Sequence, residues 1–509
     1  MEMRKQSFIR GAFVLTAAAF FTRALGFING ILLARMLGKE GIGLLMTAHP
    51  LLPLFITLTE LGLPAAISKL VSEAETQNNQ ARVRKILVVS LTITGVLSVV
   101  LTLFALFASK WIASIFLPDQ RAYYAMLALT PIIPLVAITA VLRGYFRGKQ
   151  NMNPLAISDV IETLVQIAFV VGLVHWLLPY GVEYAAAGAM ISVVLGEGAG
   201  LLYLFVRFTL YRKNKANTAT VKASPLAEGF YPTMRDLLRL GLPLTGSGFV
   251  HSLYRAFLPM LVTHSLLLSG VASAAEATKS FGLFTGYVLP LLFLPSFFTQ
   301  SLSTALIPAI SEASAVSNNR LMHHRMDVAM KIALFVGIPC TIILYVWAVP
   351  LATVLYRAPE AGPLLKLIVP LFFLYYFEAP LHAILLGLGK ASTVMWNLIL
   401  TNLFQIALIY VLGSALGIEG VALGFGFGIC LLTVLNFLSI SSTIGFYFDF
   451  RMVVKATLGA VIMVICGLGA YASMQRYGAA LPMNVLGAVC VSILAYVMTL
   501  RITRVFKEG

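Results

Sequence analysis

Long apolar stretches, separated by short polar ones, run through almost the whole chain. Fourteen of them reach the length of about 20 residues that a helix needs to cross the hydrocarbon layer of a membrane. A helix satisfies its own backbone hydrogen bonds there, so each stretch is predicted to be a spanning helix. The predicted spans are 11–34, 43–69, 86–108, 122–142, 154–178, 185–206, 237–267, 280–310, 328–350, 363–386, 391–413, 418–444, 453–473 and 482–500.

Short sequences recur in the two halves of the chain in the same order. Four such pairs occur at offsets of 236 to 241 residues: Ser72-Glu73-Ala74 with Ser311-Glu312-Ala313, Gly148-Lys149 with Gly389-Lys390, Gln166-Ile167-Ala168 with Gln405-Ile406-Ala407, and Gly181-Val182-Glu183 with Gly417-Ile418-Glu419. A single match has little weight, but four in order at a nearly constant offset indicate an internal duplication.

The duplication predicts the architecture. We expect an all-α polytopic membrane protein of about 14 transmembrane helices, with two six-helix lobes and two additional C-terminal helices. The predicted parts are an N-lobe over 1–206, a basic cytoplasmic linker over 207–236, a C-lobe over 237–445 and the last two helices within 446–509. Six is an even number, so the lobes are expected to be related by a pseudo-two-fold axis along the membrane normal, with the substrate site between them.

Charge is scarce and unevenly distributed. Hydrophobic residues make up 59% of the 509 residues and charged residues 11%, and the mean hydropathy is +0.92. With the N-terminus placed in the cytoplasm, 25 of the 36 Lys and Arg residues fall on the cytoplasmic side, eight on the other side and three within spans. This asymmetry predicts cytoplasmic termini. It also explains the net charge of +16 by topology and contact with anionic lipid, without a nucleic-acid partner.

No enzymatic or metal-binding motif is recognisable. The four cysteines, Cys340, Cys430, Cys466 and Cys490, lie in predicted spans and lack metal-ligand spacing. The sequence GLGKAS at 387–392 lacks the first glycine of a phosphate-binding loop. We therefore expect a protein that is not an enzyme and has no cofactor, and whose transport cycle draws on an ion gradient or the membrane potential.

The first predicted span contains an arginine near its middle. Arg23 lies thirteen residues from Arg10 and twelve from Arg35, which is roughly 18–20 Å from either end at ~1.5 Å per residue. Gly26 and Gly30 follow at helical spacing and predict a narrow face that another backbone can approach. Intramembrane charges commonly mark substrate paths, so Arg23 is a candidate substrate-binding residue; the alternative is an internal ion pair.

Other polar residues in spans extend the candidate list. Candidates for substrate binding are Arg23, Arg255, Glu60, Arg143 and Arg147, because two cations facing a cleft suit an anionic ligand and Arg143 and Arg147 stand at its inner mouth. Candidates for ion coupling are Glu60, Asp159, Glu162, Glu378 and His382. For Glu60 a structural pair with Arg23 and a coupling role stay open. The amide stripe Asn397, Thr401 and Gln405 is expected to make hydrogen bonds between helices, and Glu197 has no assigned role.

Three segments carry a resemblance to a known family: TRALGFINGILLARMLGKEGIGL from Thr22, LGLPAAISKLVSEAE at 61–75 and LRGYFRGKQNMNPLAISDVIE at 142–162. The chain resembles the stage V sporulation protein B and MurJ-like flippases of the multidrug/oligosaccharidyl-lipid/polysaccharide exporter superfamily. The resemblance implies movement of an undecaprenyl-pyrophosphate-linked sugar precursor, such as lipid II, to the outer leaflet of the bacterial cell membrane. Such a flippase serves peptidoglycan, spore cortex or polysaccharide synthesis, with membrane lipids and cell-wall synthesis proteins as further partners.

The resemblance also implies a cationic central cavity, in which Arg23 matches the arginine of the motif R-x-L-G-F. At Asn29 this chain departs from the family, whose members carry a second arginine there, and the second helix reads LFITLTE where they carry arginines. We therefore expect a less cationic cavity. The alternative function is a cation-coupled multidrug antiporter of the same superfamily, which needs carboxylates in its lobes. A third class is a non-transporting scaffold for envelope synthesis.

Overall fold

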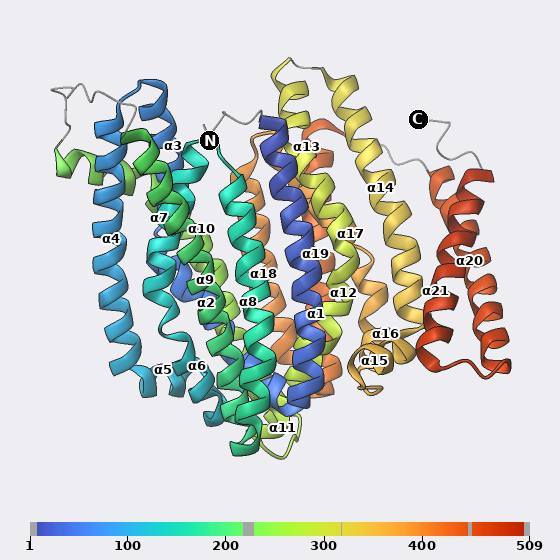
Figure 1. Ribbon diagram of the computed structural model, residues 1–509. Coiled ribbons are helices and arrows are strands. Elements are labelled where there is room, and N and C mark those ends of the chain that lie inside the picture. The colour runs from blue at the N-terminus through green and yellow to red at the C-terminus, as the bar shows by residue number, and fades with distance from the viewer. Residues whose placement is uncertain (1–7, 217–228, 317, 446–449, 503–509) are drawn as a thin grey trace. The chain divides into compact units, whose positions relative to one another are not determined.

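In the computed structural model the described residues are 8–216, 229–316, 318–445 and 450–502, and every regular element among them is helical (Figure 1). The first part of the chain forms α1 (Phe8–Ala48), α2 (Leu51–Glu60), α3 (Leu63–Thr76), α4 (Gln80–Phe107), α5 (Ser109–Phe116), η1 (Gln120–Ala122), α6 (Tyr123–Leu129), α7 (Ile132–Gly148), α8 (Asn153–Leu177), η2 (Leu178–Tyr180), α9 (Val182–Ala216) and α10 (Phe230–Leu268). The predicted all-helical class is confirmed.

The second part of the chain continues the helical series. It forms α11 (Ala274–Leu283), the π-helix η3 (Phe284–Val288), α12 (Leu289–Phe293), η4 (Leu294–Ser296), α13 (Phe297–Ala315), α14 (Asn319–Val346), α15 (Ala348–Tyr356), α16 (Ala361–Phe372), α17 (Tyr375–Gly387), α18 (Ala391–Leu416), α19 (Ile418–Ile444), α20 (Phe450–Arg476) and α21 (Leu481–Ile502). Much of the predicted linker, 217–228, lies outside the described residues.

Twelve helical stretches of the described chain are long and apolar enough to cross a membrane. They include eleven that match single predicted spans and one, Ala17–Thr76, that merges the first two predictions into 60 residues. The seventh predicted span corresponds to α10, which is not among the twelve. It contains Arg235, Asp236 and Arg239 near its start and the prolines Pro243 and Pro259 inside it. The predicted number of 14 spans therefore stays a prediction.

Contacts between backbones divide the chain into two compact units. Unit 1 comprises residues 1–260 and 274–282, and unit 2 comprises 261–273 and 283–509. The core of unit 1 lies between α3, α4, α7 and α9 and includes Ile67, Ile86 and Phe146. The core of unit 2 joins α13, α14 and α17 to α20 and α21 through residues such as Met326, Met463 and Tyr496. The two last helices are thus part of unit 2, and the predicted lobe boundaries stay a prediction.

The helix boundaries repeat with the offset found in the sequence. Both ends of α4 recur at both ends of α14 at an offset of 239 residues, and the same offset relates the last residues of α3 and α13 and of α7 and α17. Asn79 accepts a hydrogen bond from the Arg82 backbone N–H at the start of α4, and Asn318 accepts one from the Leu321 N–H at the start of α14. The duplication therefore extends to helix capping, which the four sequence matches did not include.

One span of unit 1 is broken in its middle. Helix α2 ends at Glu60, and the next two residues, Leu61 and Gly62, have φ angles of 47° and 62°. Only glycine adopts this left-handed conformation without cost, so Gly62 suits the break and Leu61 is strained. Pro64 then starts α3, where its missing N–H is not needed. The break places a carboxylate, Glu60, at a helix end inside a predicted span.

Candidate functional site

Arg23 lies on an open face of α1. The residue is exposed, and a Cβ atom added at Gly26 or Gly30, three and seven residues further along the helix, would meet no atom within 4 Å. Within unit 1 the prediction that another backbone packs on Gly26 and Gly30 is therefore wrong. Asn29 has the opposite environment, since it is 6% exposed. The position at which the sequence departs from the resembling family thus faces the core.

A second cation of unit 1 lies on α10 among polar side chains. Arg255 is exposed and acts electrostatically on His49 at the end of α1 and on His251, one turn before it on α10. The Ser252 and Thr57 hydroxyls are 2.9 Å apart and join α10 to α2. Guanidinium, imidazole and hydroxyl groups are the side chains that bind phosphate oxygens. His49 and His251 add hydrogen-bond donors that are not among the candidate residues predicted from the sequence.

Arg143 of α7 is held by two carboxylates of α8. Its Nη2 atom lies 3.1 Å from Asp159 Oδ1 and 3.0 Å from Glu162 Oε2. Glu60 and Glu197 also act on it electrostatically, but only Asp159 and Glu162 are in contact with its guanidinium. The strongest charges acting on Glu60 include Arg143, Glu197 and Arg147. The structure thus brings together five of the predicted site residues, and it adds Glu197 to them.

Close packing of α8 on α9 places Glu197 in this cluster. A Cβ atom at Gly196 would lie 2.7 Å from the Glu162 carbonyl oxygen, and one at Gly200 would lie 3.0 Å from Ser158 Oγ. The Ser158 hydroxyl donates to the Gly200 carbonyl. The spacing of glycines around Glu197 in the sequence GEGAG was a signal that this face of α9 meets another helix. We refer to Glu60, Arg143, Asp159, Glu162 and Glu197 as the Arg143 cluster.

The other basic residues at the end of α7, Arg147 and Lys149, have different surroundings from those of Arg143. Lys149 is paired with Glu75, and its Nζ atom lies 5.5 Å from the ring centre of Tyr145 and 5.4 Å from that of Tyr211. Its side chain is 4% exposed, so it joins α3, α7 and α9 rather than attracting headgroups to the surface. Arg147, by contrast, is exposed and stays a candidate for substrate binding.

The remaining candidates lie in unit 2, apart from the Arg143 cluster. His382 Nδ1 is 3.8 Å from Glu378 Oε1 on α17, as the spacing of four residues predicts. Two residues of the α18 stripe make the expected hydrogen bonds to α19: Asn397 donates to Asn436 and Ser439, and Gln405 donates to the Phe425 carbonyl. The Thr401 hydroxyl, by contrast, has no hydrogen-bond partner in the described structure. Among the described residues, no three His, Cys, Asp or Glu side chains are arranged to hold a metal ion.

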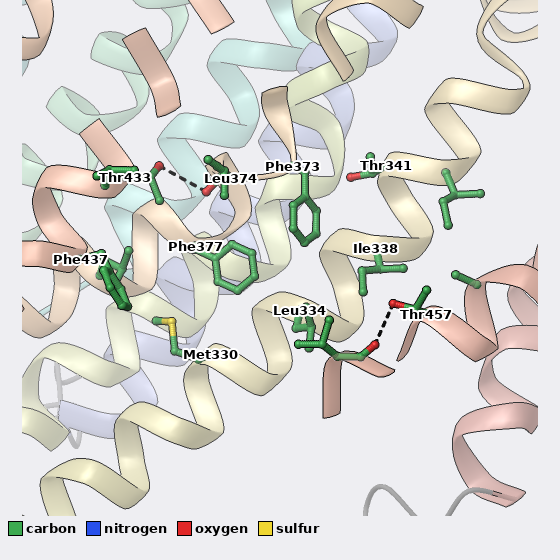
Figure 2. Close-up of a pocket in the computed structure, with 15 residues that line it drawn as sticks. Met330, Leu334, Ile338, Thr341, Phe373, Leu374, Phe377, Thr433, Phe437 and Thr457 are labelled. Atoms are coloured by element: carbon green, nitrogen blue, oxygen red, sulfur yellow. Dashed lines mark hydrogen bonds between the residues drawn. The ribbon is translucent and has the colours of Figure 1, made fainter. Parts of the chain in front are cut away.

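Unit 2 also contains an apolar cavity of about 660 Å³ (Figure 2). Its walls come from α14, the α16–α17 junction, α19 and α20, and its lining residues are Met330, Leu334, Ile338, Thr341, Ile342, Phe373, Leu374, Phe377, Leu381, Thr433, Val434, Phe437, Val453, Thr457 and Ala460. The Thr433 hydroxyl donates to the Leu374 carbonyl and the Thr457 hydroxyl to Val453. The Thr341 hydroxyl has no hydrogen-bond partner in the described structure, but the lining side chains other than the threonines are apolar, so the cavity suits a hydrocarbon chain. Helix α20, one of the two C-terminal helices, contributes Val453, Thr457 and Ala460 to this lining.

Comparison with known proteins assigns the chain to a family. The polysaccharide biosynthesis protein family matches residues 8–314, and the MatE family matches residues 285–411. Stage V sporulation protein B of Bacillus subtilis (strain 168) is 42% identical over 99% of this chain and 97% of its own length. Lipid II flippase MurJ of the same organism is 24% identical over 90% of this chain and 87% of its own.

A solved structure has the same fold. Lipid II flippase MurJ in an inward closed conformation superposes with a TM-score of 0.71 over 98% of this chain and 100% of its own, at 16% identity. At that identity the likeness concerns the fold and not the ligand. It covers the last two helices as well as the repeated part.

Proposed function

Because the chain belongs to the polysaccharide biosynthesis protein family of membrane transporters, we propose that it is a flippase for an undecaprenyl-pyrophosphate-linked sugar precursor. The proposed direction is from the inner to the outer leaflet of the bacterial cell membrane, by alternating access, with both termini in the cytoplasm. Lipid II is the first substrate to test, since a relative covering most of the chain is named for it. The product would serve peptidoglycan, spore cortex or polysaccharide synthesis.

The observation that carries the proposal is the apolar cavity of unit 2. Its volume of about 660 Å³ falls within the 300–1,000 Å³ typical of ligand sites. Every lining residue lies on a helix long enough to cross the membrane or next to one. A hydrocarbon chain enters such a site from the bilayer with little change in hydration, because the lipid and the lining are equally apolar. A polyprenyl tail can therefore lie here.

Unit 1 contains groups that suit the anionic headgroup. Arg23 is exposed on α1, and Arg255 is exposed on α10 and acts electrostatically on His49 and His251. A pyrophosphate cannot cross hydrocarbon without compensating charges, since burying an unpaired ion costs many times thermal energy. Two guanidinium groups and neighbouring imidazoles provide that compensation.

A leaflet-translocation assay tests the proposal. Purified protein in vesicles that contain lipid II is compared with the Arg23→Ala variant, and movement is measured as accessibility of the headgroup on the far side. Loss of a charged hydrogen bond to phosphate of about 1.5–3 kcal/mol predicts a roughly tenfold to hundredfold slower transfer. Arg35→Ala, a cation twelve residues further along the same helix, is the matched control. Equal rates for wild type and Arg23→Ala would exclude the assigned role of Arg23.

A cation-coupled multidrug antiporter is the second candidate. It is favoured by the MatE match over residues 285–411 and by the carboxylates around Arg143. An antiporter exports cationic drugs without moving lipid II. Drug efflux from loaded vesicles, measured alongside lipid translocation, decides between the two functions.

A further inference from the structure

We propose that unit 1 carries a saccharide-binding patch at the end away from the start of α1, where α5 and α6 lie (Figure 1), and that this patch takes a pyranose ring. The patch consists of Glu40, Asp119, Arg121, Tyr124 and Tyr184, and we refer to it as the Tyr124 patch. Binding of a saccharide is a property of unit 1 alone, whereas delivery of the sugar by the protein itself rests on the proposed function. The association is non-covalent.

Two exposed tyrosines form the apolar part of the patch. Tyr124 of α6 and Tyr184 of α9 are 42% and 37% exposed, and their ring centres lie 4.9 Å apart with an angle of 41° between the ring planes. They stand near the starts of two stretches that could cross a membrane, Gln120–Gly148 and Val182–Tyr211, so both rings lie where a span meets water. A pyranose ring packs its face of C–H groups on an aromatic ring and keeps its rim of hydroxyl groups in a polar environment.

An ion-pair group forms the polar part of the patch. Arg121 of η1, three residues before Tyr124, donates through Nη1 to Glu40 and through Nη2 to Asp119 Oδ2 at 2.8 Å. The Arg121 and Glu40 side chains are 36% and 44% exposed, and their contact uses Oε1 of Glu40. Each Nη atom of an arginine carries two N–H groups, so donors remain beside the second Glu40 oxygen, an acceptor. A sugar hydroxyl both donates and accepts, and this arrangement therefore suits vicinal hydroxyls.

Close packing brings the aromatic and polar parts together. A Cβ atom at Gly41, next to Glu40, would lie 2.9 Å from Val182 Cγ1, and Val182 is two residues before Tyr184. Gly38 interrupts α1 with a φ of 64°, a conformation that favours glycine, and the segment after this break carries Glu40. The break thus gives the end of α1 its own direction, beside the start of α9.

The repeat shows that the fold itself does not require these tyrosines. The offset of 239 residues pairs Tyr124 with Pro363, and the offset of 236 that relates the starts of α9 and α19 pairs Tyr184 with Gly420. Gly420 packs so closely that a Cβ atom there would lie 1.9 Å from the Leu412 carbonyl oxygen. Aromatic residues that only anchor a chain at the membrane interface are expected at equivalent places of both units, since both cross a bilayer. A ligand of unit 1 explains why the tyrosine pair has no counterpart.

Other ligands fit the patch less well. Its two carboxylates outnumber its one guanidinium, so a phosphate or an anionic lipid headgroup is repelled. Within the part of the chain that the structure describes, no three His, Cys, Asp or Glu side chains are arranged to hold a metal ion. With the N-terminus in the cytoplasm, as proposed, the patch faces the outside. A saccharide reaches it there from two sources: the headgroup of a translocated lipid or a glycan of the cell wall.

Saturation-transfer NMR tests saccharide binding without any cargo. Purified full-length protein in lipid nanodiscs is titrated with a soluble oligosaccharide of N-acetylglucosamine, and transfer of magnetisation to the sugar C–H protons is measured. We expect a signal in the wild type, a roughly twofold to tenfold loss of affinity in Tyr184→Leu, as for a lost aromatic contact, and retention in Tyr184→Phe. Tyr231→Leu, at a tyrosine that is 70% exposed at the start of α10, is the matched control. No signal in the wild type, or equal affinities of wild type, Tyr124→Leu and Tyr184→Leu, would overturn the proposal.

A second measurement identifies the source of the sugar. Lipid II translocation in vesicles and co-sedimentation with isolated cell-wall glycan are each compared between wild type and Tyr184→Leu. Slower translocation in the variant assigns the patch to the translocated headgroup, and weaker co-sedimentation assigns it to the wall glycan. Unchanged behaviour in both assays contradicts a role of the patch with either source. Absence of lipid transfer by the wild type, with the NMR signal intact, contradicts the proposed function and leaves the saccharide site standing.

Discussion

The helix pairs α8–α9 and α18–α19 occupy equivalent places in the repeat but hold together by different chemistry. In unit 2, Gln405 and Asn397 of α18 donate hydrogen bonds directly to α19. In unit 1, Glu162 of α8 and Glu197 of α9 lie around Arg143 with more negative than positive charge. Amides carry no charge at any pH, whereas the groups around Arg143 are ionisable. One pair is joined by neutral hydrogen bonds and the other by charged side chains.

The repeat shows how this difference arose at single positions. The offset of 239 residues pairs Glu60 with Thr299, Glu162 with Thr401 and Arg143 with His382, and the offset of 236 that relates the starts of α9 and α19 pairs Glu197 with Thr433. Each glutamate of the Arg143 cluster thus has a threonine as its counterpart. The duplicated scaffold is the same in both units, and the charges distinguish them.

Removing the central cation is expected to have the largest effect. Arg143→Gln removes the partner of Asp159 and Glu162. The three side chains are 27%, 38% and 29% exposed, so the expected loss is about 1–3 kcal/mol, below that of a fully buried pair. The His382→Gln variant at the equivalent position of unit 2 is expected to cost under about 1 kcal/mol, since His382 and Glu378 are 3.8 Å apart and His382 is 42% exposed. The free energies of unfolding of both variants are measured in detergent micelles.

A rescue variant sharpens the same comparison. Adding Glu162→Gln to Arg143→Gln removes one of the unpaired charges, so the double variant is expected to be more stable than Arg143→Gln alone. Equal losses in Arg143→Gln and His382→Gln, or no rescue by Glu162→Gln, would contradict a charge-dominated cluster.

Glycine replacements test the helix contacts of the α8–α9 and α18–α19 pairs, and their effects on stability are expected to be of intermediate size. A Cβ atom at Gly196 would lie 2.7 Å from the Glu162 backbone oxygen, so Gly196→Ala is expected to destabilise by about 1–3 kcal/mol. At Gly428 the nearest atom is Nε2 of the flexible Gln405 side chain, at 2.6 Å, and Gly428→Ala is expected to have a net effect near zero as the gain in helix propensity offsets a lost hydrogen bond.

Gly198→Ala is the control for these replacements, because its nearest neighbour is Leu135 Cδ1 at 3.9 Å. Denaturant titration in micelles gives the three free energies of unfolding. A cost at Gly196 no greater than at Gly198 would mean that α8 and α9 pack less closely than the structure has them.

The helix caps are expected to give the smallest and most equal effects. Asn79 and Asn318 have nearly the same backbone angles, with φ of −90° and −87°, and each accepts a backbone hydrogen bond. Asn79→Ala and Asn318→Ala are each expected to cost about 1 kcal/mol. Different costs, measured by thermal unfolding of the two variants, would show that the units do not share this feature energetically.

Much of the fold was predictable because it depends on local pattern. Apolar runs of the length of a bilayer located eleven spans singly, and the repeated segments pointed to helix boundaries that recur 239 residues apart. Two differences show the limit of this reasoning. The first two predicted spans form one long stretch, and α10 is not among the twelve stretches that could cross a membrane. Breaks such as that at Leu61 and Gly62, and the charged start of α10, interrupt a hydropathy pattern without ending the helical region.

The candidate site was predictable in its residues but not in its groupings. Glu60, Arg143, Asp159 and Glu162 stood out because charge is rare in spans, and the pair Glu378–His382 followed from helical spacing. Nothing in the sequence stated that Glu60 faces Arg143 and Arg147, because the residues are about 80 positions apart. The apolar cavity had no sequence signal at all, since its lining cannot be told from lipid-facing residues by composition.

By itself the sequence determined the class of this protein: an all-helical, duplicated membrane chain with a few charges placed inside its spans. Hydropathy and repetition suffice for that, because a bilayer leaves a chain few ways to satisfy its backbone. Only the tertiary structure decided which charges meet. It paired Arg143 with Asp159 and Glu162, left open space beside Gly26 and Gly30 and gathered side chains from four regions of unit 2 around a cavity. The physical reason is that such contacts depend on how helices pack in three dimensions, which the order of residues in one helix does not contain.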